Sequence, residues 1–157
     1  MKAINVCTID KAYKGISKYV IKTPIITNEE INNSFGAKVY FKLECNQKTG
    51  SFKIRGALNK ILQLTKYQKK KGIIAFSSGN HGQAVSYAAK LLNINSTVVM
   101  PEDAPRIKID QTKKNGAKII FYDRYRENRE KIAINIAKKT SQILIKPFDD
   151  EDIIIGQ

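Results

Sequence analysis

The sequence lacks a long hydrophobic run. None of its apolar stretches approaches the roughly 20 residues that a transmembrane helix needs. The N-terminal stretch MKAINVCTID is interrupted by polar residues too early for a secretory signal peptide. These absences predict a cytoplasmic chain with no membrane partner. The 42% hydrophobic content over 157 residues is sufficient for the core of one ordinary domain.

Cysteine and histidine are also scarce. Cys7 and Cys45 have neither CxxC spacing nor a neighbouring histidine, so neither a zinc site nor a disulfide framework is indicated. His81 is the only histidine, and no carboxylate spacing beside it is typical of a metal site. We therefore expect no bound metal and interpret the two cysteines as small buried apolar side chains.

Acidic residues are few, because 14 Asp and Glu face 28 Lys and Arg, giving a net charge of +14. Such an excess raises nucleic acid as a partner. The basic residues are scattered, however, and only Lys69, Lys70 and Lys71 form a run, with little aromatic interleaving. We interpret the charge as compositional and expect no nucleic-acid partner.

Short β-rich runs alternate with longer helical patterns along the chain. Apolar residues at helical spacing from Val6 to Val20 predict an N-terminal amphipathic helix. Strands are expected at residues 39–44, 72–78, 96–100, 117–123 and 142–148, and helices at residues 51–64, 82–92, 105–115 and 126–141. This alternation predicts an α/β fold with a parallel sheet flanked by helices. Ligands of such sheets bind beyond the carboxyl ends of the strands.

Both common phosphate-binding patterns are missing, since the sequence contains neither GxGxxG nor GxxxxGK[ST]. The run GIIAFSSGNHG instead leads from a strand through small residues directly into a helix. Glycines allow a ligand to approach the backbone, and the helix N-terminus offers unpaired N–H groups. Residues 77–81 are therefore a candidate anion site. The alternative is a tight turn that uses Gly79 and Asn80 only for their conformational tolerance.

Lys53 follows a Thr-Gly-Ser turn in KTGSFKIRGA, where the helical pattern begins. The helix dipole disfavours a cation at that end, and burial would lower the pKa of the amine further. The amine would then be a nucleophile near neutral pH. A solvated side chain is the other interpretation of this position.

The two motifs together resemble a known family. QKTGSFKIRGALNK and SSGNHGQAVSYAAKL resemble segments of the pyridoxal-phosphate enzymes of the threonine dehydratase and serine racemase family, which have fold type II. KTPIIT, VVMPEDAPRIKID, NGAKII and the terminal IIIGQ resemble further segments in the same order. The resemblance thus extends over the whole chain.

The resemblance implies a role for each site residue. Lys53 resembles the lysine that bonds to the cofactor, pyridoxal 5'-phosphate, and later moves the α-proton, and Phe52 would lie against the cofactor ring. Asn80 resembles the residue that hydrogen-bonds the ring hydroxyl. Ser78 resembles the serine that handles the proton on the opposite face in racemases. The loop that receives the substrate α-carboxylate would consist of Ser77, Ser78, Gly79, Asn80 and His81.

The resemblance also implies an activity and a division of the chain. Residues 1–44 would be an N-terminal segment of a large domain, 45–150 the small α/β domain with the lysine, and 151–157 the start of the rest of the large domain. A threonine or serine dehydratase, releasing a 2-oxo acid and ammonia, is the leading interpretation. Serine racemase, 3-hydroxyaspartate ammonia-lyase and an inactive remnant are the alternatives.

The family's chain continues beyond position 157, where its glycine-rich phosphate loop lies. We therefore expect activity to need that further half, supplied as a separate C-terminal fragment, and a homo-oligomer is a second possibility. Arg126 is a candidate contact for a second carboxylate of 3-hydroxyaspartate.

Overall fold

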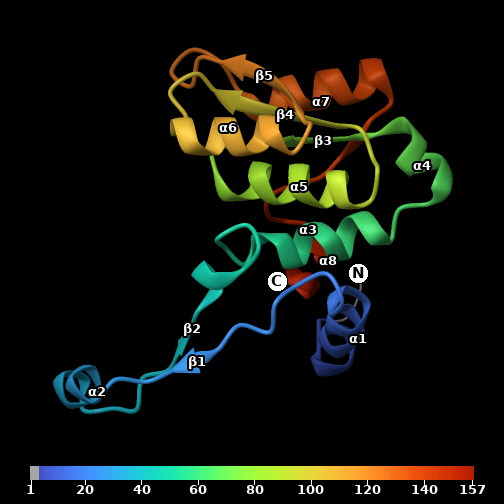
Figure 1. Ribbon diagram of the computed structural model, residues 1–157. Coiled ribbons are helices and arrows are strands. Elements are labelled where there is room, and N and C mark those ends of the chain that lie inside the picture. The colour runs from blue at the N-terminus through green and yellow to red at the C-terminus, as the bar shows by residue number, and fades with distance from the viewer. Residues whose placement is uncertain (1–3) are drawn as a thin grey trace.

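The computed structural model describes residues 4–157, and Figure 1 shows them in chain order. The elements are α1 (Val6–Ile16), β1 (Ile25–Ile26), α2 (Glu29–Phe35), β2 (Phe41–Lys42), the 3₁₀ turn η1 (Glu44–Asn46), α3 (Lys53–Leu62), α4 (Lys66–Lys71), β3 (Ile73–Phe76), α5 (Asn80–Leu91), β4 (Ser96–Pro101), α6 (Arg106–Lys114), β5 (Lys118–Tyr122), α7 (Arg129–Thr140), β6 (Ile143–Leu144) and α8 (Glu151–Gly156). Residues 1–3, which the predicted N-terminal segment includes, lie outside the described part.

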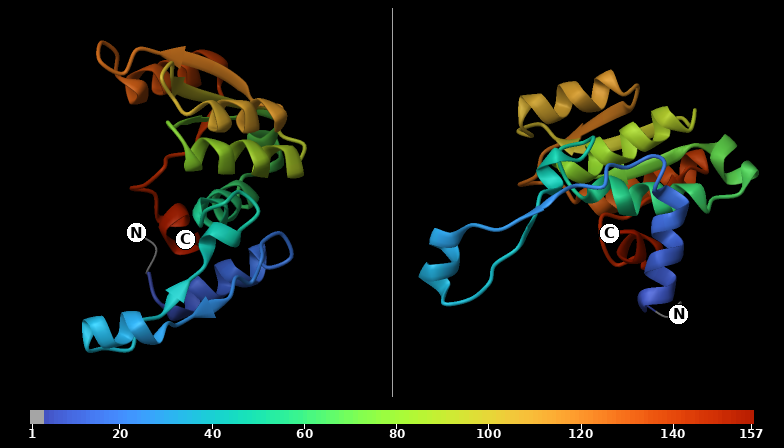
Figure 2. Two further views of the ribbon diagram at one scale, coloured as in Figure 1. Left: turned by 60° about the vertical axis from the view of Figure 1, so that its left-hand side comes forward. Right: turned by 60° about the horizontal axis from the view of Figure 1, so that its bottom comes forward.

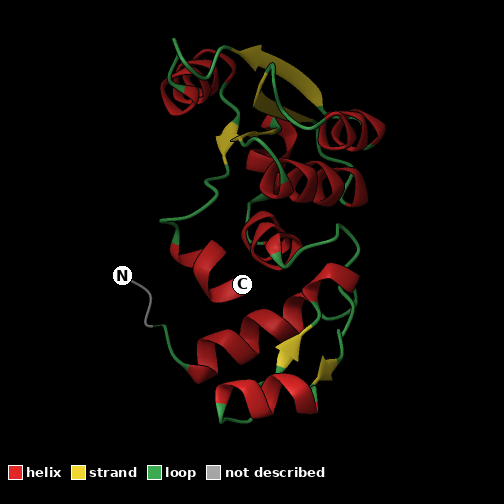
Figure 3. Ribbon diagram, turned by 90° about the vertical axis from the view of Figure 1, so that its left-hand side faces the viewer, coloured by secondary structure: helices red, strands yellow, loops and turns green. Residues whose placement is uncertain are grey.

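Four strands form the parallel sheet that the sequence predicts. Their order is β5-β4-β3-β6, and every neighbouring pair is parallel. Helices α5 and α6 cover one face, while α7 covers the other, as the views in Figures 1 and 3 show. The predicted fold class, a parallel sheet flanked by helices, is confirmed.

Strand β3 shows why the central strands are continuously apolar. Ile73 and Ala75 belong to the core cluster shared with α3 and α5, whereas Ile74 and Phe76 belong to the cluster under α7. A strand covered on both faces needs apolar residues at every position. Buried strands of this kind fix where the loops at their carboxyl ends emerge.

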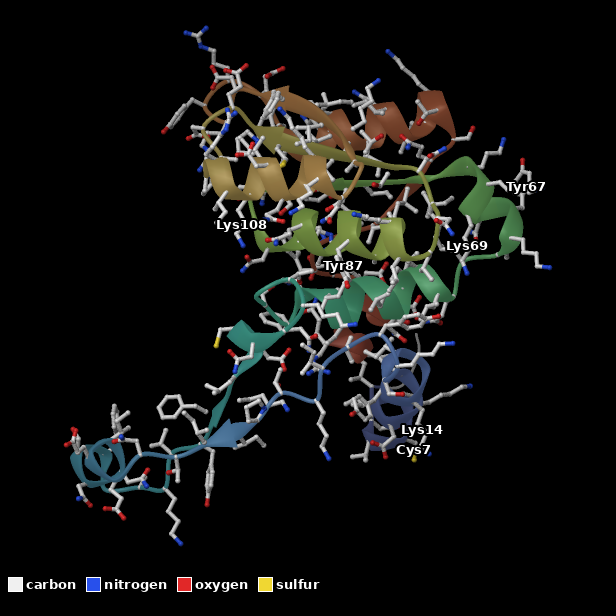
Figure 4. The ribbon with its side chains drawn as sticks, viewed as in Figure 1. Cys7, Lys14, Tyr67, Lys69, Tyr87 and Lys108 are labelled. Carbon is white, nitrogen blue, oxygen red and sulfur yellow. The ribbon has the colours of Figure 1, made fainter. Side chains whose placement is uncertain are left out.

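Below α5 the helices form further layers. Helix α3 packs on α5, and both α8 and α1 pack on α3 (Figure 1). Tyr87 of α5 points toward α3 and packs against their common core (Figure 4). Helix α1 ends at Ile16, so it is shorter than the pattern up to Val20 predicts. Cys7 of α1 and Cys45 of η1 are exposed, so the expectation that both cysteines are buried is wrong.

The run at residues 39–44 does not join the parallel sheet. Its strand β2 pairs antiparallel with β1, and their four residues are exposed. With α2, these strands form an arm that extends away from the stacked layers (Figure 2). Among residues 4–157, no helix has both the length and the apolar character to cross a membrane.

Candidate active site

Lys53 begins helix α3, directly after a sharp turn. Gly50 has a φ of +69°, a left-handed conformation that favours glycine. The side chain of Gln47 anchors this turn, because its amide accepts from the Ile21 N–H and donates to the Ile21 carbonyl, both at 2.9 Å. The local sequence thus fixes the place from which the Lys53 side chain leaves the backbone.

The Lys53 amine is held by neutral acceptors. Its Nζ donates to the Pro147 carbonyl at 2.9 Å and lies 3.4 Å from Oε1 of Gln157. It also lies 5.0 Å from the ring centroid of Phe52, which is itself partly exposed. Burial lowers the pKa of Lys53 below its ordinary value. The arrangement favours the neutral, nucleophilic form of this amine more than an exposed lysine would.

The candidate anion loop lies between β3 and α5. Oγ of Ser77 accepts from the Gly79 N–H at 3.1 Å, which closes the turn. Helix α5 begins at Asn80 rather than at Gly82, so Asn80 and His81 stand in its first turn. A Cβ at Gly82 would lie 2.9 Å from Cγ1 of Val98, so glycine lets the helix start approach β4. The first N–H groups of an α-helix have no intrahelical acceptor and point outward.

The ring of His81 is buried and directed inward. Its Nε2 lies 3.1 Å from the Ile145 carbonyl, which as an acceptor requires the proton on Nε2 in the neutral ring. Burial lowers the pKa of His81 to about 4; the Ile145 hydrogen bond opposes this, and the Lys53 cation adds to it. The group that His81 offers at the start of α5 is therefore its main-chain N–H.

Segment 145–147 connects the two motifs. The Ile145 carbonyl meets His81 of α5, and the Pro147 carbonyl meets Lys53 of α3. The structure therefore brings the two predicted motifs into contact with the same short segment. A desolvated amine thus lies beside the open N-terminus of a helix, at the carboxyl edge of a parallel sheet.

A cavity of about 360 Å³ opens at the carboxyl ends of β3 and β5. Ser78, Arg124 and Arg129 are among its lining residues, whereas Lys53 is not. Arg124 is paired with Asp103 at 2.8 Å. The guanidinium of Arg129 lies 5.7 Å from the Phe76 ring centroid, a cation–π distance.

The sequence interpretation chose a different arginine for a second carboxylate. Arg126 is 86% exposed, pairs with Asp123 at 3.5 Å and does not line this cavity. Arg129, at the first position of α7, does line the cavity, and the sequence interpretation did not consider it. The rule that ligands bind beyond the carboxyl ends of strands pointed to this connection after β5 but not to the residue.

The elements form an α/β domain with a partly buried lysine amine near the carboxyl edge of its parallel sheet. The family model described as pyridoxal-phosphate dependent enzyme matches residues 16–157. The chain belongs to this family.

Three relatives refine the comparison. The chain is 49% identical over 146 residues to an L-threo-3-hydroxyaspartate ammonia-lyase of Saccharomyces cerevisiae, covering 93% of this chain and 45% of the relative. It is 44% identical over 149 residues to a serine racemase of Schizosaccharomyces pombe, covering 95% and 46% respectively. The crystal structure of a Dictyostelium discoideum serine racemase superposes with a TM-score of 0.88 at 43% identity, covering 98% of this chain and 50% of that one. The chain spans about half the length of the curated relatives it matches.

The residues present fit one end of the cofactor. The Lys53 amine has no carboxylate partner among the described residues, so nothing charged competes with a carbonyl compound for it. The partly exposed Phe52 ring beside this amine is suited to lie against an aromatic ring. Asn80 is exposed at the helix start and offers both a donor and an acceptor.

Proposed function

We propose that the chain is the lysine-bearing part of a pyridoxal-phosphate dependent ammonia-lyase that acts on a hydroxy amino acid. The observation that carries this proposal is the partly buried Lys53 amine, held by the Pro147 carbonyl two residues after the Ile145 carbonyl that contacts His81 at the start of α5. Residues 45–150 would be the lysine-bearing domain, and residues 1–44 and 151–157 would be parts of a larger one. A separate C-terminal polypeptide, or a second copy of the chain, would complete the site.

Each residue has a distinct task in this proposal. Lys53 would hold the cofactor covalently, and its amine, once displaced by the amino group of the substrate, would take the α-proton. Phe52 would lie against the cofactor ring, and Asn80 would hydrogen-bond the ring hydroxyl. The loop of residues 77–81 would receive the substrate α-carboxylate, as the helix dipole of α5 favours an anion there. The N–H groups of Ser77 and Gly79 already donate to the Val99 carbonyl and to Oγ of Ser77, so the other N–H groups of the loop would make these contacts. When bound, the cofactor supplies the electron sink that makes the α-proton acidic.

The net reaction follows from these tasks. Removal of the α-proton and departure of the β-hydroxyl together release one water molecule. Hydrolysis of the dehydrated product then consumes one water molecule. The products are a 2-oxo acid and ammonia. Arg129 at the cavity supports 3-hydroxyaspartate as substrate, because its guanidinium is matched to a second carboxylate. L-Serine and L-threonine, which lack that group, would be slower substrates.

Serine racemization is the second candidate function. Ser78 lines the cavity on the carboxyl side of β3, which supports its use as the proton carrier opposite Lys53. The serine racemase relatives support the same activity. A Ser78→Ala variant would lose D-serine formation while keeping ammonia release. If D-serine formation were unchanged, Ser78 would have no such role.

The experiment compares the chain alone with the chain supplied with the separately expressed C-terminal half of the Saccharomyces cerevisiae relative. Ammonia and D-serine are measured from L-serine, L-threonine and 3-hydroxyaspartate. We expect ammonia release in the complemented mixture, fastest from 3-hydroxyaspartate, and none with Lys53→Ala. Equal activity in wild type and Lys53→Ala would overturn the proposal. Silence with all three substrates, despite complementation, would favour an inactive remnant.

Arg129 has a matched control in Arg126, which lies three positions earlier and is solvent-exposed. Replacing Arg129 with Met removes a charge-assisted contact worth about 1.5–3 kcal/mol, or roughly 10-fold to 100-fold in KM for 3-hydroxyaspartate. The KM for L-serine would change little. The variant Arg126→Met would leave both values unchanged, and an equal loss in both variants would contradict the assignment.

A further inference from the structure

One face of α3 carries two lysines. Lys53, Gly56 and Lys60 are spaced three and four positions apart, so they lie along one side of the helix. Helix α8 packs on α3 (Figure 1). A Cβ at Gly56 would lie 2.6 Å from the Ile153 carbonyl oxygen and 2.7 Å from Cγ of Gln157. The glycine therefore permits backbone contact between the two helices midway between the lysines.

Lys60 lies at the far end of this face and is bound to two carboxylates. Its Nζ is 2.9 Å from Oδ2 of Asp150 and 3.1 Å from Oδ2 of Asp152. The three side chains are only 21%, 15% and 14% exposed, respectively. This partial burial shields the ion pairs from solvent screening more than at an open surface. We call Lys60, Asp150 and Asp152 the acidic clamp.

The acidic clamp engages the very start of α8. Asp150 is the N-cap of this helix, since its Oδ1 accepts from the N–H groups of Asp152 and Ile153 at 3.0 and 3.2 Å. The neighbouring Asn59 donates to the main-chain carbonyl of Asp152 at 2.7 Å. Side-chain bonds from α3 thus fix both the capping carboxylate and the first turn of α8.

The same segment supplies the partners of the reactive amine. Pro147, whose carbonyl accepts from Lys53, lies three residues before Asp150, and Gln157 follows directly after α8. A displacement of α8 from α3 would move both acceptors. His81 of α5 is bound to Ile145, which precedes the displaced residues, so it would keep its place.

We propose that Lys60 is a positioning residue that, through Asp150 and Asp152, holds residues 147–157 on α3 so that Pro147 and Gln157 cover the Lys53 amine. The proposal rests on the proposed function for its catalytic meaning. The positioning itself is a property of the chain without cofactor. The cover reduces the contact of the amine with water and holds it in place for its carbonyl partner.

The test measures how acetic anhydride labels Lys53 as a function of pH in the full chain without cofactor, with the Lys53 peptide quantified by mass spectrometry. Lys60→Gln removes the clamp, Lys60→Arg keeps a cation there, and Lys70→Gln is the control on the exposed α4. With Lys60→Gln we expect the midpoint of the Lys53 profile to move up toward that of an exposed lysine. Lys60→Arg and Lys70→Gln would retain the wild-type midpoint.

Hydrogen exchange of the α8 amides provides a second measurement. Loss of the clamp would accelerate this exchange by about tenfold, because α8 would open locally more often. An unchanged Lys53 profile in a folded Lys60→Gln protein with a loosened α8 would overturn the proposal. An equal change of the Lys53 profile in Lys70→Gln would also overturn the proposal. If Lys60→Gln does not fold, Asp152→Asn replaces it: Asp150 still pairs with Lys60, so we expect a folded chain and smaller changes in the same directions.

This outcome is separable from that of the proposed function. A Lys53 profile that depends on Lys60, in a chain that never attaches the cofactor, would support the clamp and refute the function. Attachment of the cofactor to Lys53, with a Lys53 labelling profile that does not depend on Lys60, would support the proposed function and refute the role of the acidic clamp.

Discussion

The two ends of the α3 face contain the same residue type in opposite states. At one end, burial lowers the pKa of Lys53, whose partners are a main-chain carbonyl and an amide oxygen. At the other end, burial also disfavours the charge of Lys60, but the bonds to Asp150 and Asp152 outweigh it and raise the pKa. The difference lies in the partners, because both amines leave the same helix face and both are partly desolvated.

This comparison shows how one helix separates chemistry from anchoring. A neutral acceptor positions an amine without a countercharge, so the amine remains available to a carbonyl carbon. A pair of carboxylates holds an ammonium ion in its charged form and makes it an anchor. Figure 4 labels other lysines, such as Lys14, Lys69 and Lys108, on α1, α4 and α6. Lys69 donates to the Leu62 carbonyl at 3.1 Å and Lys108 to Oε1 of Gln83 at 2.8 Å, so a neutral acceptor alone does not distinguish Lys53. What distinguishes it is a neutral acceptor together with burial that lowers the pKa of the amine.

The largest expected effect is a loss of folding stability in acid. It is caused by His81, whose pKa is lowered by burial and also by Lys53. The pKa of His81 is about 4 in the folded chain, against an unfolded value of about 6.5. The unfolded chain therefore binds more protons between these values, so stability is lost as pH falls from 6.5 toward 4. At ~1.4 kcal/mol per pH unit, the loss is roughly 3 kcal/mol. Urea unfolding at a series of pH values measures it.

His81→Gln is the variant for this measurement, because His81 is the only histidine in the sequence. The variant would show little slope in stability between pH 6.5 and 5, above the range in which ordinary carboxylates titrate. A flat curve in the wild-type chain over the same interval would show that the ring is not buried in its neutral form.

The next effect comes from breaking the contact between α3 and α8, which lies midway between the two lysines. Gly56→Ala would drive α8 away from α3, because the added Cβ meets the Ile153 main-chain oxygen at 2.6 Å. Overpacking of this kind costs about 1–3 kcal/mol of unfolding free energy. Gly15→Ala in α1 is the control, since nothing lies within 4 Å of its added Cβ. It would raise stability by about 0.5–1 kcal/mol.

A double-mutant cycle examines the Lys60 end alone. Lys60→Gln and Asp152→Asn would each lower the unfolding free energy by about 1 kcal/mol, because the pairs are partly shielded from water. Together they would cost less than the sum, since one interaction is removed twice. Additive losses in urea unfolding would mean that the two side chains do not interact.

The smallest effect is a change in the His81 pKa. Lys53→Met removes a cation that lowers the His81 pKa, although burial is the larger cause. Ring-proton NMR would therefore show a small upward shift in the His81 midpoint. Lys60→Met would leave this midpoint in place. An equal shift of the His81 midpoint in both variants would mean that Lys53 and Lys60 have the same electrostatic effect on His81.

The sequence predicted the parts of the fold that local patterns encode. The apolar runs of β3, β4 and β5 and the helices between them appear where they were expected. The run at 39–44 has the same composition, but its antiparallel partner Ile25–Ile26 is not visible in a local pattern. Helix α4 has almost no apolar side, yet a capping box of Thr65 and Gln68 marks its start and could have indicated it.

The candidate site also contains features that local sequence patterns predict and features that they do not. Lys53 and residues 77–81 follow turn and helix-start signals that are local, so the sequence singled them out. The acidic clamp joins Lys60 to residues about ninety positions later, and no periodicity specifies such a contact. The inward direction of the His81 ring also depends on a distant carbonyl, that of Ile145. Packing decides these features only after the elements have assembled.

The central claim is that Lys53, among the 28 lysines and arginines of the chain, is the amine matched to the cofactor. The direct measurement incubates the chain with limiting pyridoxal phosphate, fixes any carbon–nitrogen bond with borohydride, and locates the added mass by peptide mass spectrometry. The account predicts modification at Lys53, lost in Lys53→Arg and retained in Lys60→Arg. Modification spread over the exposed lysines, with Lys53 no more reactive than Lys70, would contradict it.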